Sequence, residues 1–348
     1  MTAETLPQRD VTPILERAGE LTYPALRQAV DTLAPQMRRV AGYHLGWLDA
    51  AGNEQRSGRG KGIRYTLALL GTEAVGAPVE TGIPGGVAVE LIHNFSLLHD
   101  DLMDGDEERH HRATAWTIFG SSAAILGGVA LLALAEEVLL APGTSQGAAA
   151  AKMLTEATAR LVTGQTDDLD FETRTAVPLE ECVRMAGNKT AALISASAAI
   201  GAVLAGAPEP TVTALAAFGE HLGLAFQLVD DLLGIWGAPE LTGKPVLADL
   251  RAGKKTLPVS AALHAGGPPA EELATLLADG GDDPARFALE AELIERAGGR
   301  DWTVAEARRQ LALAQEQLAG AGLARTERGQ EAARELSAVA DFVVRRQL

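Results

Sequence analysis

A single cysteine, Cys182, occurs in the 348 residues, so an internal disulfide is impossible and a reducing compartment fits the sequence. Aromatic residues make up only 4%, and few segments alternate in the manner of strands, which argues against a β-sandwich or barrel and predicts an all-α fold. Basic residues are scarce, 30 against 46 acidic ones. The formal charge of -16 argues against nucleic acid or an anionic membrane surface as the main partner.

A secretory or membrane-spanning segment is not expected. The N-terminus carries acidic residues and has no apolar run behind a basic start, so it does not resemble a signal peptide, and residues 1–20 are expected to be a flexible terminus. The longest apolar run, residues 123–141, is interrupted by Glu136, Glu137 and two adjacent glycines, which predicts a buried helix. We therefore expect a cytoplasmic protein.

Helical periodicity dominates the rest of the chain. Apolar residues recur at helical spacing over residues 22–50, 63–76, 85–104, 121–141, 147–163, 178–205, 210–235, 254–264 and 303–346. Glycine and proline clusters fall between most of these ranges, where helices should end. Residues 265–300 are richest in glycine, proline and aspartate, yet periodic leucines within them predict short helices joined by loops. No second domain is indicated, so residues 1–348 are expected to form one domain.

A first acidic motif follows the apolar stretch of residues 85–98. Asp100 and Asp104 are four residues apart, so they project from one face of the predicted helix, with Asp101 beside them. Clustered carboxylates repel one another unless they are protonated or hold a cation, and an oxygen-only cluster suits Mg²⁺. A solvated helix end is the simpler alternative. Because negative charge is unfavourable at a helix C-terminus, the motif favours a metal site.

A second acidic pair, Asp230 and Asp231, ends another apolar segment, and Gln227 lies one turn earlier on the same face. Mg²⁺ commonly binds through one or two carboxylates together with phosphate oxygens. Two acidic helix ends therefore predict a ligand that carries a phosphate or diphosphate.

Several basic residues that could bind such an anion stand close to glycines or to the acidic motifs. Each alone is best explained as surface charge, whereas their occurrence together with two acidic pairs favours phosphate binding. These residues are Lys61, Arg64, Arg109, Arg112, Lys189, Lys244, Lys254 and Lys255.

Seven short motifs follow one another along the chain: GKGIR, HNFSLLHDDLMD, GQTDDLDFE, KTAALI, FQLVDDLLG, GKPVLADL and GKKTLP. In this order they resemble the landmarks of the trans-isoprenyl diphosphate synthases, also called polyprenyl synthetases. The resemblance, from about Gly58 to about Pro258, implies an antiparallel helix bundle around a central cavity, the isoprenoid synthase fold, usually homodimeric. It implies that an allylic diphosphate ionises with the help of Mg²⁺, that isopentenyl diphosphate attacks the cation, and that a proton is then lost.

The resemblance also implies roles for residues at the matching positions, with both acidic motifs at the mouth of the cavity. Three Mg²⁺ ions, bound to the allylic diphosphate, would be held by Asp100, Asp104 and Asp230, supported by Asp101 and Asp231. Positive charge at this diphosphate would come from Arg109, Lys189 and Lys254. Isopentenyl diphosphate would bind at Lys61, Arg64 and His93. Further substrate contacts would come from His110, Thr190, Gln227 and Lys244.

Product length in this family depends on bulk beneath the first motif. Phe95 lies five residues before Asp100, at the family's chain-length position, and Ser96 follows it. The first motif also lacks the two-residue insertion of many bacterial short-chain members. The resemblance therefore favours a C20 product, with C15 as the next choice.

The chain departs from the family pattern in four places. His110 stands where a second arginine follows Arg109, Gly234 where a third aspartate ends the second motif, and Tyr65 and Gly128 where proline and aspartate are common. Histidine offers no guanidinium fork. One alternative is therefore a terpene synthase of similar fold, which ionises one allylic diphosphate and cyclises or hydrolyses it. The other is a non-catalytic partner subunit, which the intact first motif disfavours.

Overall fold

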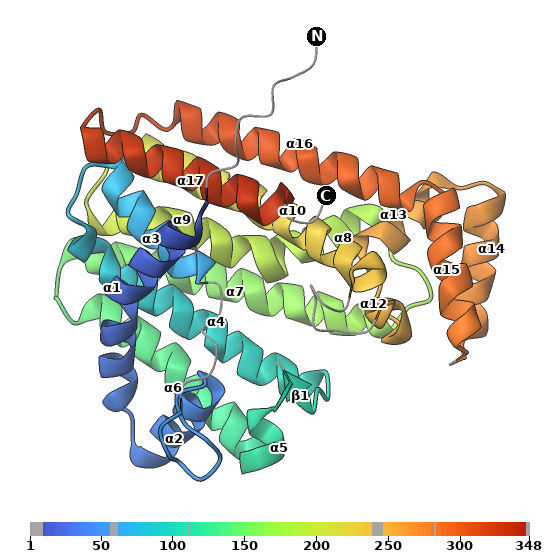
Figure 1. Ribbon diagram of the computed structural model, residues 1–348, viewed down its shortest axis with the longest axis horizontal. Coiled ribbons are helices and arrows are strands. Elements are labelled where there is room, and N and C mark those ends of the chain that lie inside the picture. The colour runs from blue at the N-terminus through green and yellow to red at the C-terminus, as the bar shows by residue number, and fades with distance from the viewer. Residues whose placement is uncertain (1–9, 56–61, 110, 239–245, 282, 346–348) are drawn as a thin grey trace. The chain divides into compact units, whose positions relative to one another are not determined.

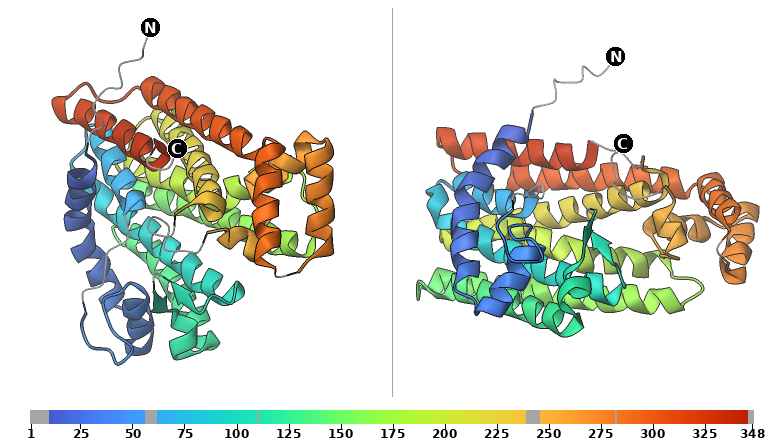
Figure 2. Two further views of the ribbon diagram at one scale, coloured as in Figure 1. Left: turned by 45° about the vertical axis from the view of Figure 1, so that its right-hand side comes forward. Right: turned by 60° about the horizontal axis from the view of Figure 1, so that its bottom comes forward.

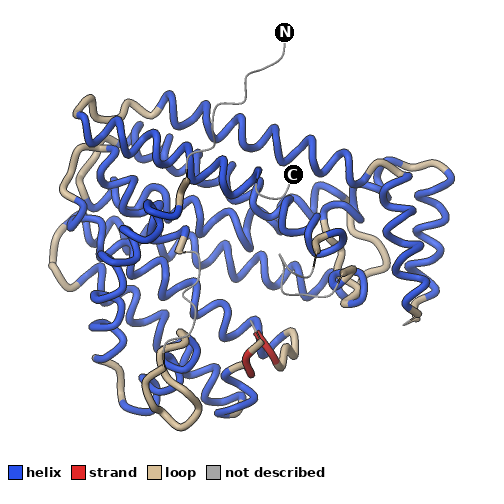
Figure 3. The backbone as a smooth tube through the Cα atoms, in the orientation of Figure 1, coloured by secondary structure: helices blue, strands red, loops and turns tan. Residues whose placement is uncertain are grey.

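The computed structural model describes residues 10–55, 62–109, 111–238, 246–281 and 283–345. Helices hold 79% of the chain, far above the roughly one third typical of globular domains. Within the described residues the strands are β1 (Glu108–Arg109) and β2 (Arg112–Ala113), which form one short antiparallel hairpin (Figure 3). The prediction of an all-α fold is confirmed.

The chain divides into two compact units, the first within Met1–Thr155, Ala196–Ala216 and Ala321–Val339. In this unit α4 packs most extensively on α6 and also contacts α1 and α3 (Figure 1). Its elements are α1 (Thr12–Asp31), α2 (Pro35–His44), α3 (Ile63–Ala74), the 3-10 turn η1 (Val79–Gly82), α4 (Ile83–Met103), β1, β2, α5 (Ala115–Phe119), α6 (Ser121–Leu140), and parts of α7 (Ser145–Thr173), α9 (Ala192–Leu204), α10 (Glu209–Trp236) and α17 (Glu327–Arg345).

A buried carboxylate ties three helices of this unit together. Glu73 of α3 accepts hydrogen bonds from Arg17 of α1 at 2.9 and 2.8 Å, and it also pairs with Arg328 of α17. Arg328 reaches Glu335 at 2.8 Å. Because a buried charge is tolerated only when it is paired, this network fixes α1 and α17 against α3.

The second unit lies within Glu156–Ser195, Ala217–Gly320 and Ala340–Leu348. Here α13 packs on α16 and α14 packs on α15, the pair drawn in orange in Figure 2. Its core includes Ile235, Phe287 and Leu293. Besides the remaining parts of the shared helices, it contains α8 (Leu179–Ala186), the π turn η2 (Gly187–Ala191), α12 (Ala248–Arg251), α13 (Leu257–Ala265), α14 (Pro268–Asp279), α15 (Pro284–Arg296) and α16 (Gly299–Gly320). The prediction of one domain for residues 1–348 stays a prediction.

The structure corrects several predicted boundaries. Residues 22–50 are not one helix, because α1 ends at Asp31 and α2 begins at Pro35, whose fixed φ and missing N–H favour the first turn of a helix. Residues 12–20, expected to be flexible, form the first half of α1. The range 303–346 is divided between α16 and α17. Residues 265–300 contain α14 and α15 joined by short loops, in agreement with the leucine spacing.

Two helices of the described chain, α6 and α10, have the length and apolar composition of a membrane-crossing helix. The most apolar window is 50% buried within the protein in α10 and 39% buried in α6. On α6, Ile125, Leu126 and Val129 are 45%, 56% and 48% exposed. The expectation of a buried helix over residues 123–141 is therefore met on one face of α6 only.

Candidate active site

The first acidic motif occupies the C-terminal end of α4. This helix ends at Met103, with Asp104 as its C-cap, and Gly105 follows in the left-handed conformation (φ 69°) that commonly terminates helices. Asp100 and Asp104 are half-buried and lie one turn apart on the same face. This end of α4 therefore presents two carboxylates, in agreement with the predicted spacing.

The middle aspartate of this motif turns away from solvent. Asp101 is only 2% exposed, and its Oδ1 accepts a hydrogen bond of 2.6 Å from Nε of Arg109 on β1. Burial raises the pKa of the Asp101 carboxyl, and the neighbouring guanidinium opposes that rise. The carboxylate of Asp101 thus holds Arg109 close to the motif.

Half-buried His93 and Arg64 lie in the same unit, and both are residues that the resemblance assigns to isopentenyl diphosphate. His93 stands two turns before Asp100 on α4, and burial, followed by the charges of Arg64 and Arg109, lowers its pKa well below the usual value. Nε of Arg64 on α3 is buried, with no hydrogen-bond partner among the described residues. A neutral imidazole and an unsatisfied guanidinium donor suit an acceptor-rich anion.

Glu90 is the acidic partner of this group. Burial raises the pKa of Glu90, while Arg64 and a hydrogen bond from Asn94 oppose the rise. Nδ2 of Asn94 donates to Oε1 of Glu90 at 3.3 Å and to the carbonyl of Glu90 at 2.8 Å. Neither residue was predicted, although both lie in the apolar helix that precedes the first motif.

His44, the last residue of α2, belongs to the same group and was also missed. Burial, followed by the charges of Arg109 and Arg112, lowers the pKa of its imidazole to about 3. No local spacing relates residue 44 to His93, so only the folded chain reveals their association.

Arg112 has a structural role in this arrangement, although it was one of the candidate phosphate-binding residues. Its Nη1 and Nη2 donate to the carbonyls of Tyr43 at 2.9 Å and Leu48 at 2.8 Å. Its guanidinium also lies 4.0 Å from the centre of the Tyr43 ring. These contacts fix the end of α2, and hence His44, beside the hairpin.

The second acidic motif lies near the C-terminal end of α10, in the second unit. Asp230 is exposed, whereas Asp231 is 6% exposed. The carboxylate of Asp231 accepts from Nε2 of Gln227 at 2.7 Å and from the backbone N–H of Leu257, the first residue of α13, at 2.8 Å. Burial nevertheless raises the pKa of Asp231 to about 7.

The π turn η2 brings two predicted residues to this unit's site. Oγ1 of Thr190 donates to Oε1 of Gln227 at 2.6 Å, which extends the chain of hydrogen bonds that leads to Asp231. Nζ of Lys189 is paired with Asp168 of α7 at 2.5 Å. A π turn inside a helical segment is frequent at functional sites. Asp168 was not predicted individually, although it lies in the quoted motif GQTDDLDFE.

The position of the missing third aspartate is filled from another element. A Cβ on Gly234 would lie 1.8 Å from Oδ2 of Asp249, so the carboxylate of Asp249 rests directly on the backbone of α10. The backbone N–H of Lys254 donates to the carbonyl of Asp249 at 3.0 Å. The glycine therefore admits a carboxylate from α12 one turn beyond Asp230.

Gly128, which stands where aspartate is common in the family, likewise makes room for a side chain of another helix, here beneath the first motif. A Cβ on Gly128 of α6 would lie 2.3 Å from Nε2 of His99, so this glycine makes room for the imidazole. The His99 ring contacts Phe95 edge to face, with the ring centres 4.9 Å apart. Phe95 is 7% exposed, and Oγ of Ser96 donates to the carbonyl of His93 at 2.9 Å. Phe95 thus packs below the first motif, in a position consistent with a floor.

Three predicted residues, Lys61, His110 and Lys244, lie outside the described part of the chain. Their expected contacts with substrate stay predictions.

Each acidic motif, taken by itself, offers oxygen donors of the kind that Mg²⁺ accepts. Among the described residues no three His, Cys, Asp or Glu side chains form a ready-made metal cage. Mg²⁺ does not require one, because it usually keeps several waters and binds through one or two carboxylates together with substrate phosphates. Half-buried Asp100 and Asp104 and exposed Asp230 supply oxygen ligands of this kind.

Comparison with known proteins identifies clear relatives. A family model described as polyprenyl synthetase matches residues 46–291. The chain is 50% identical over 345 residues to a (2E,6E)-farnesyl diphosphate synthase of Mycobacterium tuberculosis, covering 97% of this chain and 94% of that protein. It is 42% identical over 285 residues to a geranylgeranyl diphosphate synthase of the same species, covering 82% and 80%.

A solved structure agrees with these relatives. The crystal structure of a polyprenyl synthetase from Streptomyces coelicolor A3(2) matches with a TM-score of 0.92 at 52% sequence identity. The match covers 96% of this chain and 100% of that one.

Proposed function

Because this chain belongs to the polyprenyl synthetase family and is a trans-prenyltransferase, we propose that it joins isopentenyl diphosphate to an allylic diphosphate in a magnesium-dependent reaction. The product would be a short-chain isoprenyl diphosphate, C15 or C20, with release of diphosphate. The observation that carries the proposal is the pair Asp100 and Asp104 on one face at the end of α4.

The carboxylates would bind the metal. Asp100, Asp104 and Asp230 are the proposed Mg²⁺ ligands, and bound Mg²⁺ would stabilise negative charge on the departing diphosphate. Asp101 and Asp231 would support these ligands. Positive charge for the allylic diphosphate would come from Arg109, Lys189 and Lys254.

Isopentenyl diphosphate would bind beside the first motif. The buried Nε of Arg64 and the neutral imidazole of His93 are donors suited to its oxygens. Lys61 and His110 would complete this pocket. Substitution of His110 by arginine is expected to lower the Michaelis constant for isopentenyl diphosphate, whereas an unchanged constant would remove His110 from the pocket.

Chain length would be set at Phe95. The family position of Phe95 favours C20, whereas the greater similarity to a farnesyl diphosphate synthase favours C15. In either case Phe95→Ala should lengthen the products because it removes bulk beneath the motif. Unaltered products would mean that Phe95 only packs in the core.

We propose a cytoplasmic homodimer, and the apolar face of α6 supports the dimeric part of this proposal. Exposed Ile125, Leu126 and Val129 lie on one helix, and burying them against a second copy would remove apolar surface from water. Sedimentation of the purified protein tests this assembly, and a monomer at micromolar concentration would contradict it.

The test of the proposed reaction is product analysis with Mg²⁺. Dimethylallyl, geranyl, farnesyl or geranylgeranyl diphosphate is supplied with and without isopentenyl diphosphate. Longer diphosphates are expected only when isopentenyl diphosphate is present, and their length identifies C15 or C20. A hydrocarbon or alcohol formed from one allylic substrate alone would instead identify a terpene synthase. Inactivity in every combination would favour the non-catalytic subunit.

A further inference from the structure

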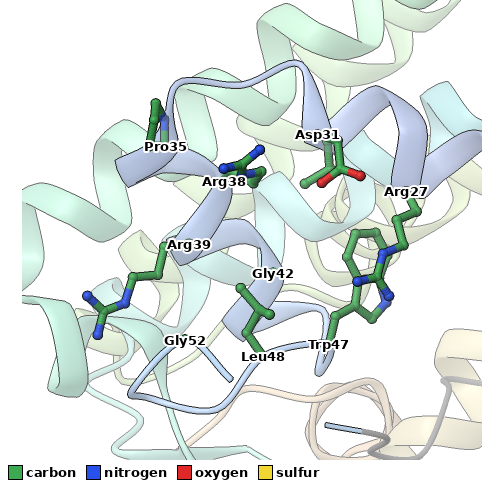
Figure 4. A pocket seen from close by; sticks show the side chains of 10 residues that line it. Arg27, Asp31, Pro35, Arg38, Arg39, Gly42, Trp47, Leu48 and Gly52 are labelled. Atoms are coloured by element: carbon green, nitrogen blue, oxygen red, sulfur yellow. The ribbon is translucent and has the colours of Figure 1, made fainter. Parts of the chain in front are cut away.

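A pocket in the first unit is lined by none of the predicted site residues. It lies between α1, α2 and the loop that follows α2, and its volume is about 290 Å³ (Figure 4). Arg27, Arg38 and Arg39 line it together with one acidic residue, Asp31. Three guanidinium groups around one hollow are unexpected in a chain with a formal charge of -16.

Two of the three arginines are already held in place. Arg27 pairs with Glu54, and its guanidinium lies 5.7 Å from the centre of the Trp47 ring. Nη2 of Arg39 donates to the carbonyl of Ala50 at 2.5 Å. Arg38 is exposed and forms no ion pair with any residue that the structure describes. The pocket therefore has two fixed guanidinium groups, of which Arg27 is paired with Glu54, and the available guanidinium of Arg38.

Trp47 adds a second, independent sign of a ligand. Its indole lines the pocket, and its Nε1–H is buried without an acceptor among the described residues. Buried donors without a partner are rare in folded proteins, so this N–H lacks an acceptor that a ligand could supply. The remaining lining includes the apolar side chains of Val30, Pro35 and Leu48.

We propose that this pocket is a second binding site for a small phosphate-class anion, a phosphate or diphosphate group carried on a compact apolar group. Guanidinium and indole N–H donors require an acceptor-rich, negatively charged ligand, for which arginine is the preferred partner. The apolar walls favour an organic ester over the free anion. Because the pocket contains neither acidic motif, binding there does not need Mg²⁺.

The test is calorimetric titration in EDTA, with inorganic diphosphate in one arm and geranyl diphosphate in the other. Wild-type protein should bind both, and geranyl diphosphate more tightly. Arg38→Gln should weaken binding about tenfold because it removes a charge-assisted hydrogen bond. Trp47→Phe should weaken it by a smaller factor, since the ring is kept and only the N–H is lost.

The matched control is Arg308→Gln, which removes another exposed arginine, from α16 and outside the pocket lining. It should bind like wild type. Equal affinities of wild type, Arg38→Gln and Trp47→Phe would overturn the proposal. Equal losses of affinity in Arg38→Gln and Arg308→Gln would overturn it too, because they would indicate that the anion responds to the overall charge of the protein and not to this pocket. If wild type binds inorganic diphosphate and geranyl diphosphate equally well, and only Arg38→Gln loses this binding, the ligand is the free anion and the apolar walls do not contribute. None of these measurements uses prenyl transfer.

Discussion

The two acidic motifs bury their middle aspartate in different ways. In the first unit Asp101 is compensated by a cation, the guanidinium of Arg109. In the second unit Asp231 has neutral donors, the Gln227 amide and the Leu257 backbone N–H, and its pKa rises to about 7. Desolvation favours the neutral acid in both carboxyl groups. The Arg109 guanidinium opposes the rise at Asp101 and neutral donors oppose it at Asp231, and in neither case is the rise cancelled. Similar acidic motifs thus give carboxyl groups with different electrostatic properties.

The motifs also differ one turn further along their helices. The first has its own carboxylate there, Asp104, on the same face as Asp100. The second has Gly234, against which Asp249 places a carboxylate from α12. The second motif therefore has a third carboxylate beside it that comes from another element of the second unit.

The largest expected effect comes from removing the outer aspartate of either motif. Asp100→Asn and Asp230→Asn should each slow diphosphate release by roughly a thousandfold, because a metal ligand that stabilises the leaving group is lost. Thermal unfolding should be unchanged. Asp106→Asn, an exposed residue just after the first motif, is the control and should keep full activity. Full activity in either test variant would remove that aspartate from the metal site.

Replacing the middle aspartates, Asp101 and Asp231, should lower the free energy of unfolding for different reasons. Asp101→Asn leaves Arg109 without its anion and should lower the free energy of unfolding by about 1–3 kcal/mol. Asp231→Asn replaces a carboxylate that accepts two hydrogen bonds by an amide that can accept with only one atom, so about 1–2 kcal/mol is expected. Denaturant unfolding measures both values. An unchanged free energy of unfolding in Asp231→Asn would mean that the Gln227 amide and the Leu257 N–H donate to water in the variant.

Gly234→Ala tests the carboxylate supplied from α12. The new Cβ would overlap Asp249, so the variant should lose about 1–3 kcal/mol of stability. Gly320→Ala is the matched control, because a Cβ there meets nothing within 4 Å and should be neutral or slightly stabilising. Equal stability of the two variants would show that Asp249 moves aside without cost.

The last prediction concerns pH and His44, beside the first motif. The folded-state pKa of about 3 lies below the ordinary 6.5, so below pH 6.5 the unfolded chain binds a proton that the folded chain does not. Stability from this residue is complete above pH 6.5 and is lost as the pH falls toward 3. His44→Gln should therefore show a shallower fall of melting temperature over this range. Parallel melting curves would contradict the burial of a neutral His44.

Much of the site is visible in the sequence because it is local. The four-residue spacing of Asp100 and Asp104, and of Gln227 and Asp231, fixes which side chains share a face of one helix. The structure bears out both relations. The helix boundaries were predicted less well, since the turn between α1 and α2 and the division of residues 303–346 depend on where tertiary contacts end each helix.

The sequence by itself determined the all-α class, the family and the two carboxylate-bearing helix ends, because composition, motif order and helical spacing are properties of neighbouring residues. Only the tertiary structure decided which distant side chains meet these ends. The charges of Arg109 and Arg112 act on His44, Asp101 accepts a hydrogen bond from Arg109, and Asp249 packs against Gly234. Burial and charge compensation arise from such long-range packing, and no spacing along the chain encodes them.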